Sequence, residues 1–378
     1  MISYVWTCKQ PFWAGRGGSE NYTAGHIREL NRRGIPARLI TVGLGENDGR
    51  DDFTDIAFTS LDSKEQLSEL DDTLIGVSYP INVPTKRQPY TILHIPLRSS
   101  LGNDPLFRSE GIETNRLMAP SNFAAKMWRS TLGMHAGKIT AVHPFAEEVF
   151  ARVKRPQPKT DKIRILFAGR LMPDKGIFTL LAALHLQEME GVSYELTATT
   201  AADNTNSGPI IRKLLEAHPW INVVPARRNP KEMAELMAEH DIVLMPSSNI
   251  FWKETFGIVS VEAQHAGCRV VGSNSGGIPE TDCGGLLLVR PDDPQALARG
   301  IVKAAALGPL TEAERLYASS KFTVGASVDR LLNVIRTTEV KRKPLLHKQG
   351  ALVREQLDLA FGTISELGLR FARENKLR

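Results

Sequence analysis

Short apolar runs alternate with longer amphipathic stretches along most of the chain. Residues 2–6 form a mostly apolar run, which is typical of a buried strand. Ala24, Ile27 and Leu30 then recur every three residues, as the inward face of a helix does. Residues 37–42 predict the next strand. The order strand, helix, strand predicts an α/β protein with a parallel sheet.

The same alternation continues for about 300 residues. The further expected strands lie at 73–77, 90–95, 115–119, 138–142, 163–168, 194–199, 222–224, 242–245, 269–272 and 286–289. The expected helices include 122–131, 177–189, 210–218, 230–239, 294–306 and 322–335. Residues 48–72 are acidic and irregular, so we expect loops or a short hairpin there. Residues 154–162 are polar and hold two prolines, which predicts a linker between two doubly wound domains.

Composition narrows the class of protein without naming a function. The chain has 378 residues, of which 42% are hydrophobic and 24% charged, as in globular proteins. We see no apolar run of membrane-spanning length and no secretion signal, and three separated cysteines suit a reducing cytoplasm. The net charge of +5 is compatible with anionic nucleotides or an anionic lipid surface, and no nucleic-acid-binding signature occurs.

The most informative stretch is 251–280, FWKETFGIVSVEAQHAGCRVVGSNSGGIPE. A polar turn runs into an apolar helix there, and the free N–H groups of a helix start favour a phosphate. Gly257 lets a ligand approach the backbone. Glu254 and Glu262 lie about two helical turns apart, and such carboxylates suit sugar hydroxyls. Together these groups indicate a sugar nucleotide, although a lone pair of glutamates at this spacing is more often solvent-exposed.

Two further glycine turns follow strands. Residues 169–176, GRLMPDKG, carry Arg170 and Lys175, which suit a diphosphate, but the order of residues is not that of a P-loop. Near the N-terminus, AGRGGSENY lacks the dinucleotide spacing G-x-G-x-x-G, and Ser19 is the expected N-cap of the helix that follows. His94 lies at the expected carboxyl end of a strand, where ligands of open sheets bind, and it is either structural or functional.

These motifs together resemble one family. E-T-F-G-x-x-x-x-E-A, S-G-G-I-P-E and G-R-L-x-x-x-K-G resemble the signatures of retaining GT-B glycosyltransferases, in particular glycosyltransferase family 4, over about residues 1–335. The resemblance implies two Rossmann-like domains facing across a cleft, with a C-terminal helix crossing back to the first. It implies an acceptor domain at 1–153, a nucleotide-sugar donor domain at 160–320, and the crossing helix with a tail at 321–378.

The resemblance also implies roles for particular residues. Arg170 and Lys175 would bind the donor diphosphate, Glu254 the sugar hydroxyls and Glu262 the ribose. His94 would approach the donor sugar from the first domain. The other expected donor-binding residues are Gly17, Gly18, Thr255, Phe256, Gly257 and Ile258. The turn at 143–145, HPF, departs from the family's usual P-N-G-V-D-like turn. This departure bears on the acceptor specificity that the resemblance implies, or on how the chain enters the hinge between the domains.

The expected activity is therefore a retaining transfer of a hexose from a nucleotide sugar, on family frequency a UDP-sugar, to a hydroxyl group. The sugar is glucose, N-acetylglucosamine or similar, and the acceptor a glycan, a lipid-linked glycan or a small molecule. No D-x-D triplet occurs, so we expect no metal and no cofactor. The alternatives are a nucleotide-sugar epimerase or sugar phosphorylase of the same fold, an NAD-dependent oxidoreductase and a non-catalytic partner.

The last segment, 341–378, lies outside the resemblance. Its apolar residues recur at spacings of three and four and predict one amphipathic helix. This helix is expected to pack on the body or on a second subunit, or to bind a membrane surface. The expected location is the cytoplasm, with peripheral contact at the inner membrane face as the further possibility.

Overall fold

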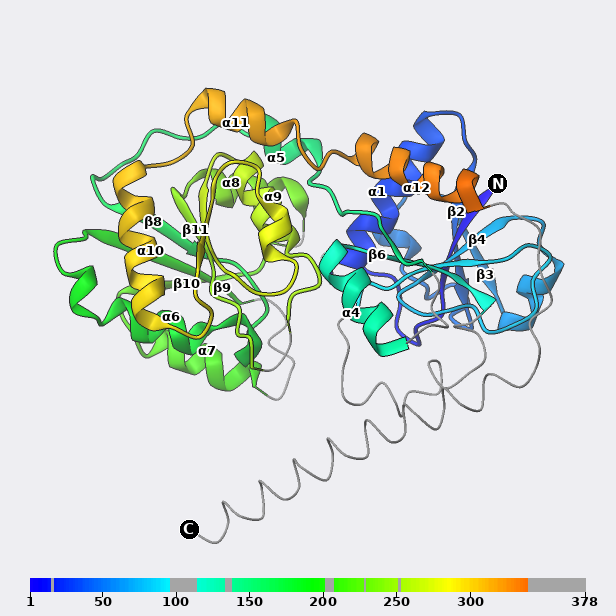
Figure 1. Ribbon diagram of the computed structural model, residues 1–378, viewed down its shortest axis with the longest axis horizontal. Coiled ribbons are helices and arrows are strands. Elements are labelled where there is room, and N and C mark those ends of the chain that lie inside the picture. Colours follow the sequence, from blue (N-terminus) through cyan, green and yellow to red (C-terminus); the bar gives the residue numbers. More distant parts are fainter. Residues whose placement is uncertain are drawn as a thin grey trace, which may run out of the picture.

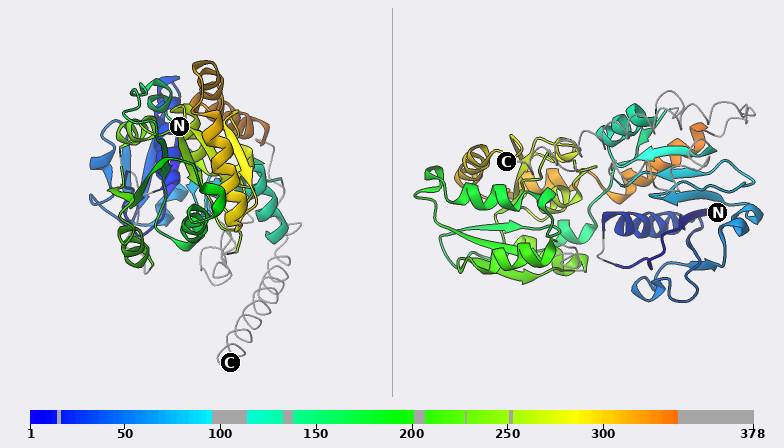
Figure 2. Two further views of the ribbon diagram at one scale, coloured as in Figure 1. Left: turned by 90° about the vertical axis from the view of Figure 1, so that its left-hand side faces the viewer. Right: turned by 90° about the horizontal axis from the view of Figure 1, so that it is seen from below.

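The computed structural model describes residues 1–14, 17–95, 114–132, 138–200, 207–227, 229–250 and 253–338. Within these residues the chain forms two α/β units side by side (Figure 1). Each unit is a parallel sheet covered by helices, and Figure 2 shows the pair from two further sides. Among the described helices, none combines the length and the apolar character needed to cross a membrane.

The N-terminal sheet has the strand order β3-β2-β1-β4-β5-β6-β7 within the described residues, and all of its pairings are parallel. Its strands are β1 (Ile2–Trp6), β2 (Ala37–Val42), β3 (Phe58–Leu61), β4 (Thr73–Val77), β5 (Tyr90–Ile92), β6 (Arg116–Ala119) and β7 (Thr140–Ala141). Its helices are α1 (Gly18–Arg32) and α4 (Asn122–Leu132), with the short 3₁₀ helices η1 (Arg50–Asp52) and η2 (Lys64–Glu69) between strands.

The C-terminal sheet has the order β10-β9-β8-β11-β12-β13 and is also parallel within the described residues. Its strands are β8 (Ile163–Phe167), β9 (Tyr194–Thr200), β10 (Ile221–Pro225), β11 (Ile242–Met245), β12 (Arg269–Ser273) and β13 (Leu286–Val289). Its α-helices are α5 (Glu148–Arg152), α6 (Ile177–Leu184), α7 (Gly208–Glu216), α8 (Pro230–Ala238), α9 (Ile258–His265), α10 (Pro294–Leu307) and α11 (Glu312–Ser319). Its 3₁₀ helices are η5 (Pro173–Lys175), η6 (Gln187–Met189) and η7 (Ile278–Thr281).

Alternate residues of the central strands face opposite layers of helices. In β11, Ile242 and Leu244 belong to the cluster that includes residues of α6, α7 and α10. Val243 and Met245 belong instead to the cluster with residues of α5, α8 and α9. A strand buried on both faces needs apolar residues at every position, which explains its uninterrupted apolar run.

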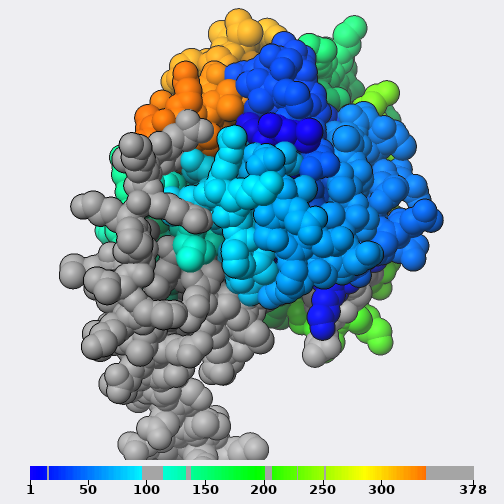
Figure 3. Space-filling view, turned by 90° about the vertical axis from the view of Figure 1, so that its right-hand side faces the viewer, coloured from blue at the N-terminus to red at the C-terminus, as the bar shows by residue number. Residues whose placement is uncertain are grey.

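Helix α12 (Val324–Thr338) leaves the second unit and packs on α1 of the first (Figure 1). Val328 and Leu331 are fully buried in the cluster that contains Ile27 and Leu30 of α1. Figure 3 shows α12, in orange, beside the blue N-terminal residues at the surface. Two facing parallel-sheet units with this returning helix are the GT-B arrangement expected from the resemblance, and that prediction of the fold is confirmed.

Two local predictions were wrong, and both errors have a physical cause. Ser19 does not cap α1, because the N-cap is Gly17, two residues earlier, and Ser19 lies inside the helix, where its hydroxyl donates to Glu20 at 2.6 Å. Residues 48–72 contain β3, which pairs in parallel with β2 and is not part of a hairpin. The strand is an edge strand of half-buried residues, so its sequence carries little apolar signal. The tail at 341–378 lies outside the described residues.

Candidate active site

A cleft of about 440 Å³ lies between the two units and is lined by both. Its lining includes all eleven residues that the sequence nominated: Gly17, Gly18, His94, Arg170, Lys175, Glu254, Thr255, Phe256, Gly257, Ile258 and Glu262. They come from the start of α1, the residues just after β5, the turn after β8, the turn before α9 and α9 itself. The structure thus brings the nominated residues together, while the role of each stays a prediction.

The turn between β8 and α6 carries the two cations of the cleft wall that the sequence nominated. Arg170 follows β8, and η5 places Lys175 directly before Gly176. Gly176 has a φ of 76° and passes so close to the main chain of Pro246 that a Cβ there would overlap the Pro246 carbonyl oxygen. Only glycine meets both conditions without strain. This close packing against Pro246 fixes the position from which the Lys175 side chain enters the cleft.

Lys175 forms an ion pair with Glu254, which comes from the turn before α9. The two side chains are 16% and 19% exposed, so the pair is largely withdrawn from water yet open to the cleft. Burial raises the pKa of Glu254, but Lys175, then Arg170 and the Ser247 hydroxyl, outweigh it and hold the pKa below its ordinary value. Glu254 is therefore an ionised acceptor beside two cations at neutral pH.

Helix α9 begins at the cleft without a side-chain cap. Its N-cap is Gly257, which has a φ of 100°. Nearby, the turn at Gly276 and Gly277 presses on the backbone of Glu254 and Thr255, and the Gly277 N–H donates to the Glu254 carbonyl at 2.8 Å. The first-turn N–H groups of α9 therefore face the cleft from a rigid loop, an arrangement that suits an anionic oxygen.

His94 approaches the cleft from the N-terminal unit. Its ring packs edge-on against Tyr22 with centroids 4.8 Å apart, and its buried Nε2 has no hydrogen-bond partner. Burial lowers the pKa of His94 to about 3, so the imidazole is neutral at pH 7. The Thr255 hydroxyl donates to the His94 carbonyl across the cleft at 3.1 Å. His94 therefore lines the cleft with a neutral ring whose buried Nε2 has no protein partner.

Glu262 lies on α9, one turn into the helix, and faces a second carboxylate. Glu262 and Glu147 both line a small cavity of about 20 Å³ beside the cleft. Burial, and then the negative charge of Glu147, raises the pKa of Glu262 to about 8. Burial also raises the pKa of Glu147. The positive charge of Arg28 lowers this pKa, and the negative charge of Asp55 raises it, so the net shift is upward. At neutral pH Glu262 is therefore largely protonated, and its hydroxyl can donate as well as accept.

This raised pKa predicts how stability changes with pH. Between the ordinary pKa of a glutamate, 4.5, and about 8, folded Glu262 keeps a proton that the unfolded chain has released. Stability is therefore lost as the pH rises through this window. Glu262→Gln removes this titration. The difference in melting temperature, variant minus wild type, should therefore be larger at pH 8 than at pH 5, by roughly 2–4 °C for each kcal/mol of stability that wild type loses over that range. Differential scanning fluorimetry over that range measures the effect.

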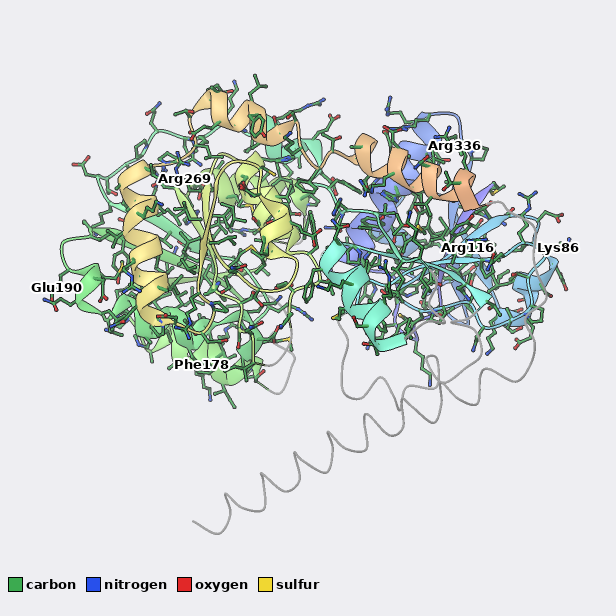
Figure 4. All side chains as sticks on the ribbon, viewed as in Figure 1. Lys86, Arg116, Phe178, Glu190, Arg269 and Arg336 are labelled. Atoms are coloured by element: carbon green, nitrogen blue, oxygen red, sulfur yellow. The ribbon has the colours of Figure 1, made fainter. Side chains whose placement is uncertain are left out.

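The matched control for this variant is Glu190→Gln. Glu190 is exposed and projects from the side of the C-terminal unit away from the cleft (Figure 4). Its melting temperature should follow wild type at every pH. Parallel profiles for wild type and Glu262→Gln would show that Glu262 is ionised throughout and would contradict the raised pKa.

The structure adds cleft residues that the sequence did not single out. Ser247 donates to Glu254 at 3.4 Å, and its place after β11 was the available signal, since ligands gather at strand ends. Ser78 follows β4 in the left-handed region, with a φ of 68°, and lines the cleft. Nothing in the sequence marks that backbone conformation for a serine. Glu147 comes two residues after the turn at 143–145 that departs from the family pattern, but its approach to Glu262 depends on tertiary packing.

Comparison with known proteins places these features in a class. Residues 162–306 match the family model described as glycosyl transferases group 1. Solved structures show the same fold over most of the chain. A glycosyltransferase from Rickettsia africae covers 89% of this chain and 97% of its own, with a TM-score of 0.67 and 18% identity. The Anabaena protein HepE, in complex with UDP and glucose, covers 89% and 100%, with a TM-score of 0.63 and 15% identity.

Relatives found by sequence point the same way over shorter stretches. A D-inositol 3-phosphate glycosyltransferase of Streptomyces avermitilis is 31% identical over 43% of this chain and 38% of its own length. A lipopolysaccharide 1,2-N-acetylglucosaminetransferase of Salmonella typhimurium is 27% identical over 50% and 53%. A 41.2 kDa protein of the Klebsiella pneumoniae cps region is 27% identical over 54% and 57%. The match thus spans about half of these relatives or less. The chain has a GT-B fold whose second unit matches the glycosyl transferases group 1 model.

Proposed function

We propose that this protein is a retaining glycosyltransferase that moves a hexose from a nucleotide sugar to an acceptor hydroxyl. The observation that carries the proposal is the Lys175–Glu254 ion pair, which lies beside Arg170 at the N-terminus of α9, a helix without a side-chain cap. Cations and free N–H groups suit the diphosphate of a donor, while an ionised carboxylate suits the hydroxyls of its sugar. A site for phosphate and hydroxyl together fits a nucleotide sugar better than either group alone.

The proposed chemistry is departure of the nucleoside diphosphate from the anomeric carbon as the acceptor oxygen attacks from the same face. Negative charge develops on the β-phosphate, and Lys175, Arg170 and the N–H groups of α9 are positioned to stabilise it. The departing phosphate takes the acceptor proton. In this proposal no metal is required, because the protein supplies the positive charge. Glu254 binds sugar hydroxyls and forms no covalent bond, and His94 contributes its free Nε2 from across the cleft.

For the substrates, we infer a UDP-linked hexose such as glucose or N-acetylglucosamine. The solved complex of the Anabaena protein with UDP and glucose supports the donor, and the Salmonella relative transfers N-acetylglucosamine by name. The acceptor, a glycan, a lipid-linked glycan or a small molecule, enters from the N-terminal unit. An NAD-dependent oxidoreductase is not favoured, since the glycine turn before α1 lacks the dinucleotide spacing. A membrane contact or a homodimer through residues 341–378 remains part of the proposal.

A thermal-shift panel with a product assay tests the proposal. We expect UDP to raise the melting temperature equally in magnesium and in EDTA, because ligand bound to the folded state adds stability by mass action. We also expect slow release of UDP from UDP-glucose or UDP-N-acetylglucosamine without added acceptor. Stabilisation by NAD but by no nucleoside diphosphate would contradict the proposed function. A shift that requires magnesium would contradict its metal independence.

A further inference from the structure

A carboxylate of the C-terminal unit caps a helix of the N-terminal unit. Glu280, in η7, accepts hydrogen bonds from the main-chain N–H groups of Asn122 at 2.8 Å and Phe123 at 2.6 Å. The Asn122 side-chain amide donates to the same carboxylate at 2.9 Å. These two main-chain groups belong to the first turn of α4, at the edge of the N-terminal unit that faces its neighbour (Figure 1).

The first-turn N–H groups of a helix have no partners within the helix. In α4, Ser121 satisfies the next two, since its hydroxyl accepts from Ala124 at 2.9 Å and its carbonyl from Ala125 at 2.9 Å. The N–H groups of Asn122 and Phe123 are therefore left to Glu280. The cap of α4 is complete only while the two units touch. Burial raises the pKa of Glu280, but its hydrogen bonds with His143 and with the main-chain N–H groups of Asn122 and Phe123 outweigh burial and hold the pKa below its ordinary value. The positive end of the helix dipole also favours a carboxylate at this place.

Glu280 also contacts the connection between the units. The His143 Nε2 lies 3.3 Å from its carboxylate, and the His143 ring packs against Phe256 before α9 and Phe322 before α12. The His143 carbonyl accepts from the Ser327 hydroxyl of α12 at 2.6 Å. His143 is one of the residues at which the sequence departs from the family's usual turn. One carboxylate therefore joins α4, the connecting turn and the C-terminal unit.

The same segment is tied to the cleft. Glu280 follows the turn at Gly276 and Gly277, which holds the Glu254 backbone. Beside it, the Ser121 hydroxyl donates to the Thr255 carbonyl at 2.5 Å across the units. A change in the contact of Glu280 with α4 therefore moves the N-terminal wall of the cleft relative to Glu254 and Thr255.

We propose that Glu280 is a positioning residue, an interdomain latch that holds the cleft closed by capping α4 from the other unit. Its effect on turnover rests on the proposed function, whereas its effect on closure does not. Glu280→Gln is the sharpest variant. The amide has nearly the same shape, but its nitrogen cannot accept, so one main-chain N–H loses its acceptor and the charge is gone.

The matched control is Glu314→Gln. Glu314 is also a capping carboxylate, since it accepts from the Thr311 N–H at 2.8 Å and pairs with Arg269, but all of these contacts lie within the C-terminal unit. Figure 4 places Arg269 in that unit, away from the junction. Both variants remove one charge and weaken one helix cap. Only Glu280→Gln removes a bond between the units.

Small-angle X-ray scattering of the full chain, with and without UDP, is the deciding measurement. We expect a larger radius of gyration for Glu280→Gln than for wild type and for Glu314→Gln, with UDP narrowing the difference. With UDP-glucose as donor, we expect the kcat for UDP release to fall roughly 10–100-fold. The Kd for UDP should change little, because most of the proposed phosphate contacts come from one unit.

A radius of gyration equal to that of wild type would overturn the latch, whatever the activity. A fall in melting temperature common to both variants with no change in scattering would also overturn it and mark Glu280 as a structural cap. If wild type itself neither binds UDP nor releases it, the proposed function fails, and a wider Glu280→Gln still supports the latch. Should Glu280→Gln not fold, Ser121→Ala removes the neighbouring bond to Thr255 and must widen the particle if closure depends on this contact.

Discussion

Lys175→Ala is expected to lower the kcat for release of UDP from a UDP-sugar by about 10²–10³-fold, the loss typical of one preorganised charge or donor at a developing anion. The ammonium group is fixed by the turn at Gly176 and lies beside Glu254 in a largely water-free position, where its field is weakly screened. A donor diphosphate gains charge as the glycosidic bond breaks, so the loss should fall mainly on kcat. Initial rates at saturating donor measure it.

The control for this variant is Lys162→Ala. Lys162 also pairs with a glutamate of the C-terminal unit, Glu195, at 3.8 Å, but both of those side chains are half exposed. Its kcat should match wild type. The melting temperature of Lys175→Ala should fall by no more than about 2–4 °C, as expected for roughly 1 kcal/mol. A kcat within threefold of wild type, or a collapse of the melting curve, would show that Lys175 is structural.

The prediction of the fold from sequence succeeded where local signals and tertiary structure agree. Buried parallel strands such as β8 and β11 need apolar residues on both faces, and their glycine turns mark the ends where ligands bind. The edge strand β3 was missed because a half-buried strand needs few apolar residues. Ser19 was misplaced because a glycine, Gly17, serves as the N-cap of α1, two residues earlier than the side-chain signal suggests.

The residues that make up the site could be predicted from the sequence, but the contacts between those residues could not. Lys175 and Glu254 were each nominated from a turn after a strand, and nothing in the spacing of 79 residues indicates that they form a pair. The raised pKa of Glu262 depends on Glu147, which comes from a segment after the last strand of the other sheet. Glu280 belonged to a quoted motif without a role, because its partners are main-chain atoms of α4. Such pairings follow from the docking of two units, which no local pattern encodes.

Glu254→Gln is expected to lower kcat/KM by about 10²-fold, which corresponds to the loss of a hydrogen bond to a charged group. The amide keeps the shape of the side chain but loses the charge that orients Lys175 and one of the acceptor positions for sugar hydroxyls. Surface pairs offer the control. Glu188 forms an ion pair with Arg299 on the same unit, with 3.6 Å between Arg299 Nη1 and Glu188 Oε1, and Glu188→Gln should leave kcat/KM unchanged. Activity of Glu254→Gln equal to that control would remove the carboxylate from the mechanism.

The double variant separates two explanations of the Glu254 effect. If Glu254 acts chiefly by orienting Lys175, the two residues work as a unit, and Lys175→Ala with Glu254→Gln should cost little more than Lys175→Ala alone. If Glu254 binds the sugar by itself, the two losses multiply. We expect a result between these limits and nearer the first, because Lys175 is the strongest of the charges that hold the pKa of Glu254 down. Fully multiplicative losses would show that the ion pair in the cleft is incidental to catalysis.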